Sequence, residues 1–416
     1  MLAQKPLPPL IRRINRVILI VLAFLCVVQC TRCAFRDKDE ADSYKTDISE
    51  NSEAVQDSLP QRILPDTVEP QHLEQSNFQA INLDHVYTQK DTGLAHTLDT
   101  YLRRYHPRNA LYLVVDAKTN EILAWGERKD SIVQSTPDYL SRATFPAASL
   151  AKTITVAAAF DSKRYSVNTE VPMIGSAHTL YKRQLSVPEN YRGPTAPVHL
   201  AFAKSYNPPI ALIGVNVGAN RLKKAASKFG FNRNYPQGIP NRSHYNPPDT
   251  GYGLAEVACG FTQETTISPL QAAGMMRAVV TQKAFEVPWD KNGANGHAPT
   301  KPLHLGIEKF SDNAYLGLRQ VLHATATEGT SRKYMSSKYI SRSFFEDLEI
   351  GGKTGSLDGS DPEGRYDWFM GFAQSRSNPD KAIVIVIMQA HGKIRTQVSS
   401  MIASLIINYW GKRELK

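Results

Sequence analysis

The sequence is poor in cysteine and lacks the spacings that mark most metal sites. Four cysteines occur in 416 residues, and Cys26, Cys30 and Cys33 lie in or beside an N-terminal apolar run, which leaves only Cys259 for the rest. None of the 11 histidines falls in an H-E-x-x-H pattern, and no Cys/His set has zinc-site spacing. Cys30-x-x-Cys33 lies outside any βαβ context, which favours membrane-proximal cysteines or a local disulfide over a redox pair. We therefore expect no metal and no other cofactor.

Charge is not concentrated in any block, although the formal net charge is +10. No Lys/Arg run with interleaved aromatic residues occurs, so we expect no nucleic-acid partner. The excess of basic over acidic residues instead favours solubility and attraction to an anionic cell surface. A hydrophobic content of 42% and 25 prolines spread along the chain are typical of a globular protein, not a disordered one.

Long apolar runs are scarce, and the exception is Val17–Val28, which follows basic residues at positions 5, 12, 13 and 16. As a helix these residues span roughly 18 Å, short of the roughly 30 Å hydrocarbon core, so a cleaved signal peptide is one alternative. If the helix continues to Phe35, with the Arg32 side chain extending outward to the headgroups, it is long enough to cross the bilayer. We favour a retained single-pass signal anchor over 17–35, with 1–16 in the cytoplasm and the remainder outside.

The rest of the chain separates into a linker and one domain. Residues 36–97 are polar and punctuated by proline, which predicts a linker, and the domain is expected over 98–416, with helical spacing beginning near Leu98. Leu111–Asp116 and Ile122–Trp125 flank a turn and predict a hairpin. Two further strands and a closing amphipathic helix are predicted at Trp368–Ala373, Ala382–Met388 and Ser399–Trp410.

Strands near both ends of the domain enclose a helical middle that runs from Ser149 to about Met276. This order predicts an α/β (α+β) fold in which a central antiparallel sheet is flanked by helices and carries an inserted helical subdomain.

Ser149-Leu-Ala-Lys152 is the only S-x-x-K in the chain, and an alanine-rich apolar stretch predicts a buried helix after it. Ser149 in the first turn puts its amide at the positive end of the helix dipole, where an oxyanion can be held. Lys152 lies one turn on, on the same face, and a buried lysine loses proton affinity and can act as a base. Alone, the motif is equally compatible with a capped helix that carries a surface lysine.

Two S-x-N triplets compete as a second motif. Ser166-Val-Asn168 follows Lys152 by 14 residues, which is roughly 21 Å if the same helix continues. Ser205-Tyr-Asn207 comes after an intervening loop, so the chain has length to return. We therefore choose Ser205 and Asn207, although a simple polar turn explains either triplet by itself.

The only K-T-G triplet lies in Gly351-Gly-Lys-Thr-Gly-Ser356, and position 347 is Asp, so the phosphate-binding G-x-x-x-x-G-K-[ST] spacing is absent. The flanking sequences DLEIGG and DWFMGFA favour edge strands. A strand that presents Lys353, Thr354 and the Ser356 amide to a groove suits an extended peptide ending in a carboxylate. By itself the triplet is also compatible with phosphate binding, or with a strand that carries no functional site.

Together the motifs resemble a known set. Their first members are 56 and then 148 residues apart, in the order found in class A β-lactamases and penicillin-binding proteins. LYLVVDAKTNEILAW is similar to the family's first hairpin, and TTISPLQAAGMM, Glu328-Gly-Thr330 and DWFMGFA are similar to later elements. From about Leu98 to Trp410 the chain therefore resembles the penicillin-binding transpeptidase family of serine D,D-peptidases.

The resemblance implies a peptidoglycan D,D-transpeptidase. Ser149 would attack the carbonyl of a peptide ending in D-Ala-D-Ala, while Lys152 takes the hydroxyl proton. Ser205, with Lys353 nearby, would pass a proton to the leaving amine, and Asn207 would hold the substrate amide.

The resemblance also implies how the substrate is held. Thr354 and Ser356, on either side of Gly355, would bind the terminal carboxylate, and the amides of Ser149 and Ser356 would form the oxyanion hole. Implied partners are stem peptides ending in D-Ala-D-Ala, β-lactams as inhibitors, the membrane through the N-terminal anchor, and other cell-wall synthesis proteins. The implied location is the bacterial inner membrane, with the domain on the extracytoplasmic side.

Several departures and alternatives stay open. Tyr206 occupies a variable slot, and the double proline after Asn207 is unusual, which puts the pose of Asn207 in doubt. Residues 36–97 leave no room for a glycosyltransferase domain or a large pedestal. A D,D-carboxypeptidase shares every motif. A serine β-lactamase does too, although Glu256 and Glu264 do not sit in the E-x-x-L-N pattern expected of class A. A β-lactam sensor or a cell-wall scaffold is the non-enzymatic alternative.

Overall fold

A computed structural model describes residues 89–415 of the protein. The anchor expected over 17–35, the cytoplasmic segment 1–16 and most of the linker expected over 36–97 lie outside this range. Within residues 89–415, no helix combines the length and apolar character that a membrane crossing requires.

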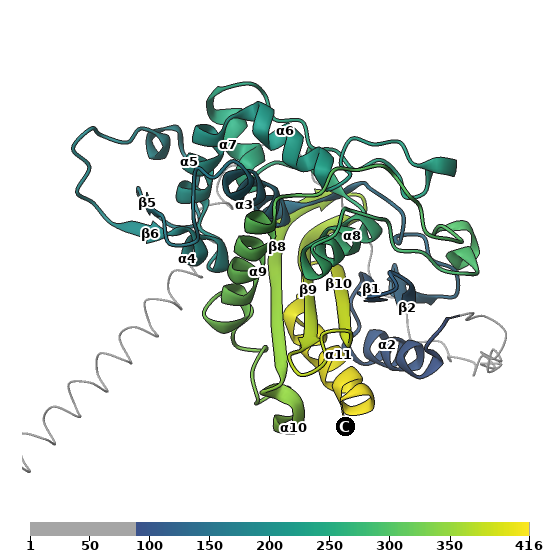
Figure 1. Cartoon of the computed structure of the whole chain (residues 1–416). Helices are drawn as coiled ribbons and strands as arrows, with labels where there is room; N and C mark the ends of the chain where they lie inside the picture. Colours follow the sequence, from purple (N-terminus) through teal and green to yellow (C-terminus); the bar gives the residue numbers. More distant parts are fainter. Residues whose placement is uncertain (1–88, 416) are drawn as a thin grey trace, which may run out of the picture. The chain divides into compact units, whose positions relative to one another are not determined.

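The domain is built on a six-stranded antiparallel sheet in the order β3-β2-β1-β10-β9-β8. Figure 1 shows β8, β9, β10, β1 and β2 of this sheet. The expected central sheet is confirmed, and so are the expected strands at both ends of the domain. β1 lies against β10, with Leu113 opposite Val386, so chain segments over 250 residues apart form the middle of the sheet. The strands are β1 (Asn109–Asp116), β2 (Ile122–Lys129), β3 (Ile132–Gln134), β8 (Leu348–Ser360), β9 (Glu363–Ser375) and β10 (Ala382–His391).

The two faces of the sheet bury separate cores, because side chains alternate along each strand. On β1, Leu113 and Val115 enter the core shared with the inserted helices, whereas Tyr112 and Val114 enter the core beneath the terminal helices. Those terminal helices are α2 (Thr92–Tyr105) and α11 (Ser399–Glu414).

Helix α2 begins at Thr92, six residues before the helical spacing expected from Leu98, so the linker prediction is wrong for 92–97. Asp91 caps the helix by accepting the Leu94 amide at 2.8 Å, and its carboxylate also pairs with Arg413 of α11 at 2.6 Å. The burial of Leu94 in the second core fixes this first turn, and a short polar stretch does not reveal that tertiary contact.

The inserted subdomain is helical, as expected, and lies over one face of the sheet (Figure 1). At its centre is α3, in which every residue from Lys152 to Phe160 is buried, and which contacts α5, α6, α7 and α9. The helices are α3 (Lys152–Asp161), α4 (Val198–Ala203), α5 (Asn207–Val217), α6 (Ala219–Lys228), α7 (Gly251–Cys259), α8 (Pro269–Thr281) and α9 (Asp312–Thr327). The short helix α10 (Arg342–Phe345) instead packs with the terminal helices, in the second core. Smaller elements are β4 (Phe145–Pro146), β5 (Glu170–Pro172), β6 (Thr195–Pro197), β7 (Thr266–Ile267) and the 3₁₀ turns η2 (Ala148–Ala151), η3 (Lys182–Leu185), η4 (Pro236–Gly238) and η5 (Gly293–Gly296).

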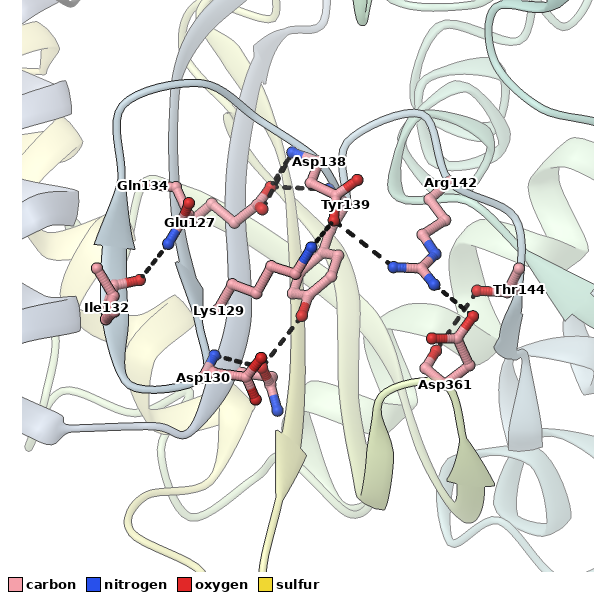
Figure 2. Close-up of polar contacts among 11 residues, drawn as sticks. Glu127, Lys129, Asp130, Ile132, Gln134, Asp138, Tyr139, Arg142, Thr144 and Asp361 are labelled. Atoms are coloured by element: carbon pink, nitrogen blue, oxygen red, sulfur yellow. Dashed lines mark hydrogen bonds and ion pairs between the residues drawn. The ribbon is translucent and has the colours of Figure 1, made fainter.

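A buried carboxylate fixes the segment that leads from β3 toward Ser149 (Figure 2). Glu127 of β2 accepts the amide of Asp138 at 3.0 and 2.9 Å and the amide of Tyr139 at 2.8 Å. Further along, Arg142 forms an ion pair with Asp361 at the β8–β9 turn. The segment is therefore tied at one end to the sheet and at the other to the hairpin that carries the K-T-G triplet.

Burial raises the pKa of Glu127 from 4.5 to about 7, with the two amide hydrogen bonds opposing the shift. The folded protein thus binds this proton more tightly than the unfolded chain. Stability from this group is complete below pH 4.5 and is lost as the pH rises through about 7. We predict that Glu127→Gln removes a pH-dependent loss of unfolding free energy of about 2.5 kcal/mol between pH 5 and pH 8.

Urea unfolding of both proteins at the two pH values measures this difference. Glu264→Gln, the same chemical change at an exposed position, is the control and should keep the wild-type pH dependence. An unchanged pH dependence in Glu127→Gln would contradict the prediction.

Candidate active site

Ser149 lies in the 3₁₀ turn η2, directly before α3. It is partly exposed, whereas the residues on either side of it are buried. The preceding Ala148 takes the left-handed conformation, with φ of 48°. Gly260, at the end of α7, packs so tightly here that a Cβ on it would lie 1.9 Å from the Ala148 carbonyl oxygen. Trp368 of β9 donates its indole N–H to the Pro146 carbonyl at 3.0 Å. The chain around Ser149 is therefore held by both the helical subdomain and the sheet.

Lys152 is fully buried, and its Nζ lies within hydrogen-bond distance of four oxygens. Nζ lies 3.1 Å from Ser149 Oγ, 2.7 Å from the Ser205 carbonyl, 3.1 Å from Ser205 Oγ and 2.6 Å from Asn207 Oδ1. A carbonyl and an amide oxygen only accept, whereas a hydroxyl also donates. A neutral amine that donates to the two obligate acceptors keeps its lone pair for a hydroxyl. This arrangement lets Lys152 act as a base toward Ser149 or Ser205.

Burial lowers the pKa of Lys152 from 10.5 to about 8. Lys353 is also fully buried, and burial, followed by the charge of Lys152, lowers its pKa well below 10.5. Both Nζ atoms lie close to the same Ser205 hydroxyl, at 3.1 Å for Lys152 and 3.0 Å for Lys353. Two ammonium groups in one dry site repel each other, so the geometry disfavours both being charged.

Ser205 and Asn207 stand at the turn between α4 and α5, where Ser205 has a φ of 60°. The double proline that follows lies in the first turn of α5, where a helix has no partner for an N–H and proline is tolerated. Asn207 is held by its own amide, which donates to the Ala177 carbonyl, and by Nδ2, which donates to the His178 carbonyl, each at 2.7 Å. The prolines therefore fit the helix start, and Oδ1 of Asn207 is left to face Lys152.

The competing triplet lies elsewhere. Helix α3 ends at Asp161, so the helix does not continue to Ser166 as the distance estimate assumed. The Ser166 amide instead donates to the Thr169 hydroxyl at 2.9 Å in an exposed turn. The structure thus brings Ser205 and Asn207, and not Ser166 and Asn168, to Lys152.

The K-T-G triplet lies on β8, which is the outer strand of the described sheet, as expected. Lys353 is buried beside Phe202, 5.3 Å from its ring centroid, and points toward Ser205. Gly355 faces the turn that carries Ser149, since a Cβ there would lie 3.3 Å from the Ala147 carbonyl oxygen. A larger residue at this position would push the strand away from the serine.

Thr354 and Ser356, expected to receive a carboxylate, have side-chain partners from other segments. The hydroxyl of Thr354 contacts that of Thr330, and Ser356 Oγ accepts from Arg365 Nε at 2.9 Å. Arg365 also lies 3.3 Å from Asp358. Arg365 belongs to none of the three motifs, and an isolated arginine on the next strand carries no sequence signal that places it beside Ser356.

The carbonyls of Ala177 and His178 were also missed. Main-chain oxygens are the same in every residue, so no pattern of side chains marks them.

The contact between Gly260 and Ala148 generates a stability prediction. Gly260→Ala adds a methyl group at a φ of 72°, within overlap distance of the Ala148 carbonyl. Left-handed strain alone costs about 1–2 kcal/mol, and the overlap adds to it, so we expect a loss of more than about 2 kcal/mol. Urea unfolding measures the loss.

Gly238→Ala is the matched control, because Gly238 has a φ of 70° and nothing within 4 Å of an added Cβ. It should show the strain without the overlap. Equal losses in the two variants would rule out the close packing behind Ser149.

Comparisons with known proteins agree with this arrangement. A sequence profile described as "Penicillin binding protein transpeptidase domain" matches residues 110–407. Peptidoglycan D,D-transpeptidase PbpA of Mycobacterium tuberculosis is 24% identical over 289 residues, which cover 64% of this chain and 54% of the relative. Stage V sporulation protein D of Bacillus subtilis is 22% identical over 350 residues, covering 76% of this chain and 50% of the relative. The chain thus spans about half the length of these curated relatives.

Solved structures show the same fold. The apo transpeptidase domain of penicillin-binding protein 3 from Burkholderia pseudomallei has a TM-score of 0.54 at 16% identity, covering 78% of this chain and 95% of that one. Penicillin-binding protein 3 of M. tuberculosis, complexed with aztreonam, has a TM-score of 0.57 at 18% identity, covering 78% of each chain. Since the family profile matches residues 110–407, which are most of this chain, the chain belongs to the penicillin-binding protein transpeptidase family.

Proposed function

We propose that the protein is a peptidoglycan D,D-transpeptidase that cross-links stem peptides through an acyl-enzyme at Ser149. The observation that carries the proposal is the placement of Lys152 Nζ within 3.1 Å of Ser149 Oγ while Ser205 and Asn207 hold it from the other side. A hydroxyl nucleophile is weak until an adjacent base takes its proton, and this geometry supplies the base.

In acylation, the Ser149 oxygen adds to the carbonyl of the penultimate D-Ala while its proton moves to Lys152. The tetrahedral intermediate then collapses, the peptide bond breaks, and the leaving D-Ala amine takes a proton through the Ser205 hydroxyl. Support for this relay comes from the Ser205 hydroxyl itself, which lies between Lys152 Nζ at 3.1 Å and Lys353 Nζ at 3.0 Å. An acceptor amine then attacks the ester and restores Ser149.

Substrate binding is proposed along β8. An extended peptide would add to this outer strand, the amides of Ser149 and Ser356 would hold the oxyanion, and Thr354, Gly355 and Ser356 would face the terminal carboxylate. The cationic Arg365 beside Ser356 supports an anionic group at this end. Asn207 would orient the substrate amide.

Proteins of this family typically act outside the cytoplasm. We propose the same location here, with residues 17–35 as a single-pass inner-membrane anchor, 36–91 as a linker and other cell-wall synthesis proteins as partners. β-Lactams would act as inhibitors by acylating Ser149. A related structure, penicillin-binding protein A of M. tuberculosis, is described as an imipenem acyl-enzyme complex, which supports this inhibition.

Labelling with a fluorescent penicillin tests the proposal. The full-length chain should form a stable adduct, Ser149→Ala should form none, and Ser166→Ala, the matched serine of the competing turn, should label like wild type. Absence of labelling in the wild-type chain would overturn the proposal in favour of a scaffold, and rapid drug hydrolysis would favour a β-lactamase. Release of D-Ala with incorporation of an acceptor amine distinguishes a transpeptidase from a carboxypeptidase.

The pKa of Lys152 sets an expected pH dependence. The lysine must be neutral to accept the Ser149 proton, so acylation should rise about tenfold per pH unit below pH 8 and level off above it. The Cys259 thiol nearby has a pKa raised by burial to about 11 and stays neutral over this range. The second-order rate constant for penicillin acylation, measured from pH 6 to 9.5, checks this. A profile without a rise would contradict the role of Lys152 as base.

A further inference from the structure

Asn207 is held in place by a segment that belongs to none of the three motifs. The carbonyls of Ala177 and His178, which accept from Asn207, lie in residues 174–185, between β5 and β6. We call these residues the Gln184 loop. We propose that Gln184 is a positioning residue, whose buried side-chain amide fixes the loop so that Asn207, and through it Lys152, stays aligned with Ser149. The inference rests on the proposed function.

The side chain of Gln184 is 1% exposed, and both of its polar atoms bind the loop. Its Oε1 accepts the Tyr181 amide at 2.7 Å and the Thr179 hydroxyl at 3.3 Å. Its Nε2 donates to the carbonyl of Ile174 at 2.7 Å and to that of Ser176 at 3.2 Å. The side-chain amide of Gln184 thus connects four positions of the loop, from Ile174 to Tyr181.

The two carbonyls that hold Asn207 lie between these attachment points. Ala177 and His178 directly follow Ser176 and directly precede Thr179, and both of those neighbours bind the Gln184 amide. Because each of these two residues is adjacent in sequence to an attachment point, the Gln184 amide constrains the direction of both carbonyls.

Other contacts attach the loop mainly at its second half. Between residues 174 and 190, only Leu180 and Gln184 are buried, and Leu180 enters the main core with the partly buried Leu185 packed against it. The Leu180 carbonyl accepts from the Tyr252 hydroxyl at 2.6 Å, which attaches the far end of the turn to α7. A buried amide whose partners are all within one segment makes that segment's shape depend on it.

Gly175 gives an independent sign of close fit. Its φ is 72°, and a Cβ there would lie 2.8 Å from Gln184 Nε2. The amide therefore occupies the space a side chain would fill, and a methyl group at position 175 should displace it.

Gln184 would affect acylation through one short contact, between Asn207 and Lys152. Asn207 Oδ1 lies 2.6 Å from Lys152 Nζ. The Ser149 and Ser205 oxygens, the Lys353 amine from β8 and the Cys259 thiol from α7 also face this Nζ. A displacement of about 1 Å in such an assembly can cost up to about 10²-fold in rate. Loss of the Gln184 amide should therefore slow acylation more than it weakens binding.

The test uses the full-length chain and a fluorescent penicillin, with the dissociation constant of the first complex and the acylation rate constant measured separately. Gln184→Met keeps the size of the side chain but none of its hydrogen bonds. We expect an acylation rate constant at least about tenfold lower, with a dissociation constant within about threefold of wild type. Gln271→Met is the matched control. Gln271 is another buried glutamine bonded to Phe229 and Tyr235, and its replacement should leave acylation near the wild-type rate.

A double-mutant cycle separates positioning from general loosening. If Gln184 acts through Asn207, then Gln184→Met added to Asn207→Ala should cause less than about twofold further loss. Full additivity, or a wild-type rate in Gln184→Met, overturns the inference. If Gln184→Met does not fold, the same measurements on Gly175→Ala test the inference.

Labelling of wild-type Ser149 in the same experiment distinguishes failure of the proposed function from failure of the Gln184 inference. If the wild-type chain forms no adduct, the proposed function fails. If the wild-type chain forms a normal adduct and the variant is unaffected, only the Gln184 inference fails.

Discussion

The burial of one lysine amine in a polar cluster is the constraint on which the rest of the site depends. Lys152 Nζ lies 2.6–3.1 Å from four oxygens that come from Ser149, Ser205 and Asn207. An ammonium group out of contact with water is costly unless its donors are satisfied, so each of these oxygens must be held accurately. The same desolvation lowers the pKa of the amine. Stability and chemical reactivity are thus set by one arrangement.

The surrounding fold supplies that accuracy from several directions. Helix α3 is buried along its length, so Lys152 cannot turn toward solvent. Gly260 packs against the backbone at Ala148, and Trp368 bonds to Pro146, which fixes the entry to Ser149 from the helices and from the sheet. The Glu127 carboxylate and the Arg142–Asp361 ion pair hold the segment before it. The reactive turn is therefore rigid although Ser149 itself is partly exposed.

The sheet brings the third motif to the same place. β1 and β10, from opposite ends of the domain, pair at its centre, and β8 becomes the outer strand beside η2. This leaves one long strand edge next to Ser149, and Lys353 reaches inward to Ser205. The Gln184 loop adds the last support, at Asn207. Four separate stretches of chain meet within one cluster.

The sequence alone determined the antiparallel sheet, its helical insertion and the three motifs, because periodicity and residue type carry that information. It favoured Ser205 and Asn207 over Ser166 and Asn168, and the fold brings the favoured pair to Lys152, although the assumed helix to Ser166 ends at Asp161. It misplaced the start of α2, which depends on the burial of Leu94. Only the tertiary structure decided the supports of Asn207 and the neighbours of Ser356. Those supports are main-chain carbonyls and a buried glutamine, whose roles come from distances between distant segments, and no local pattern encodes such distances.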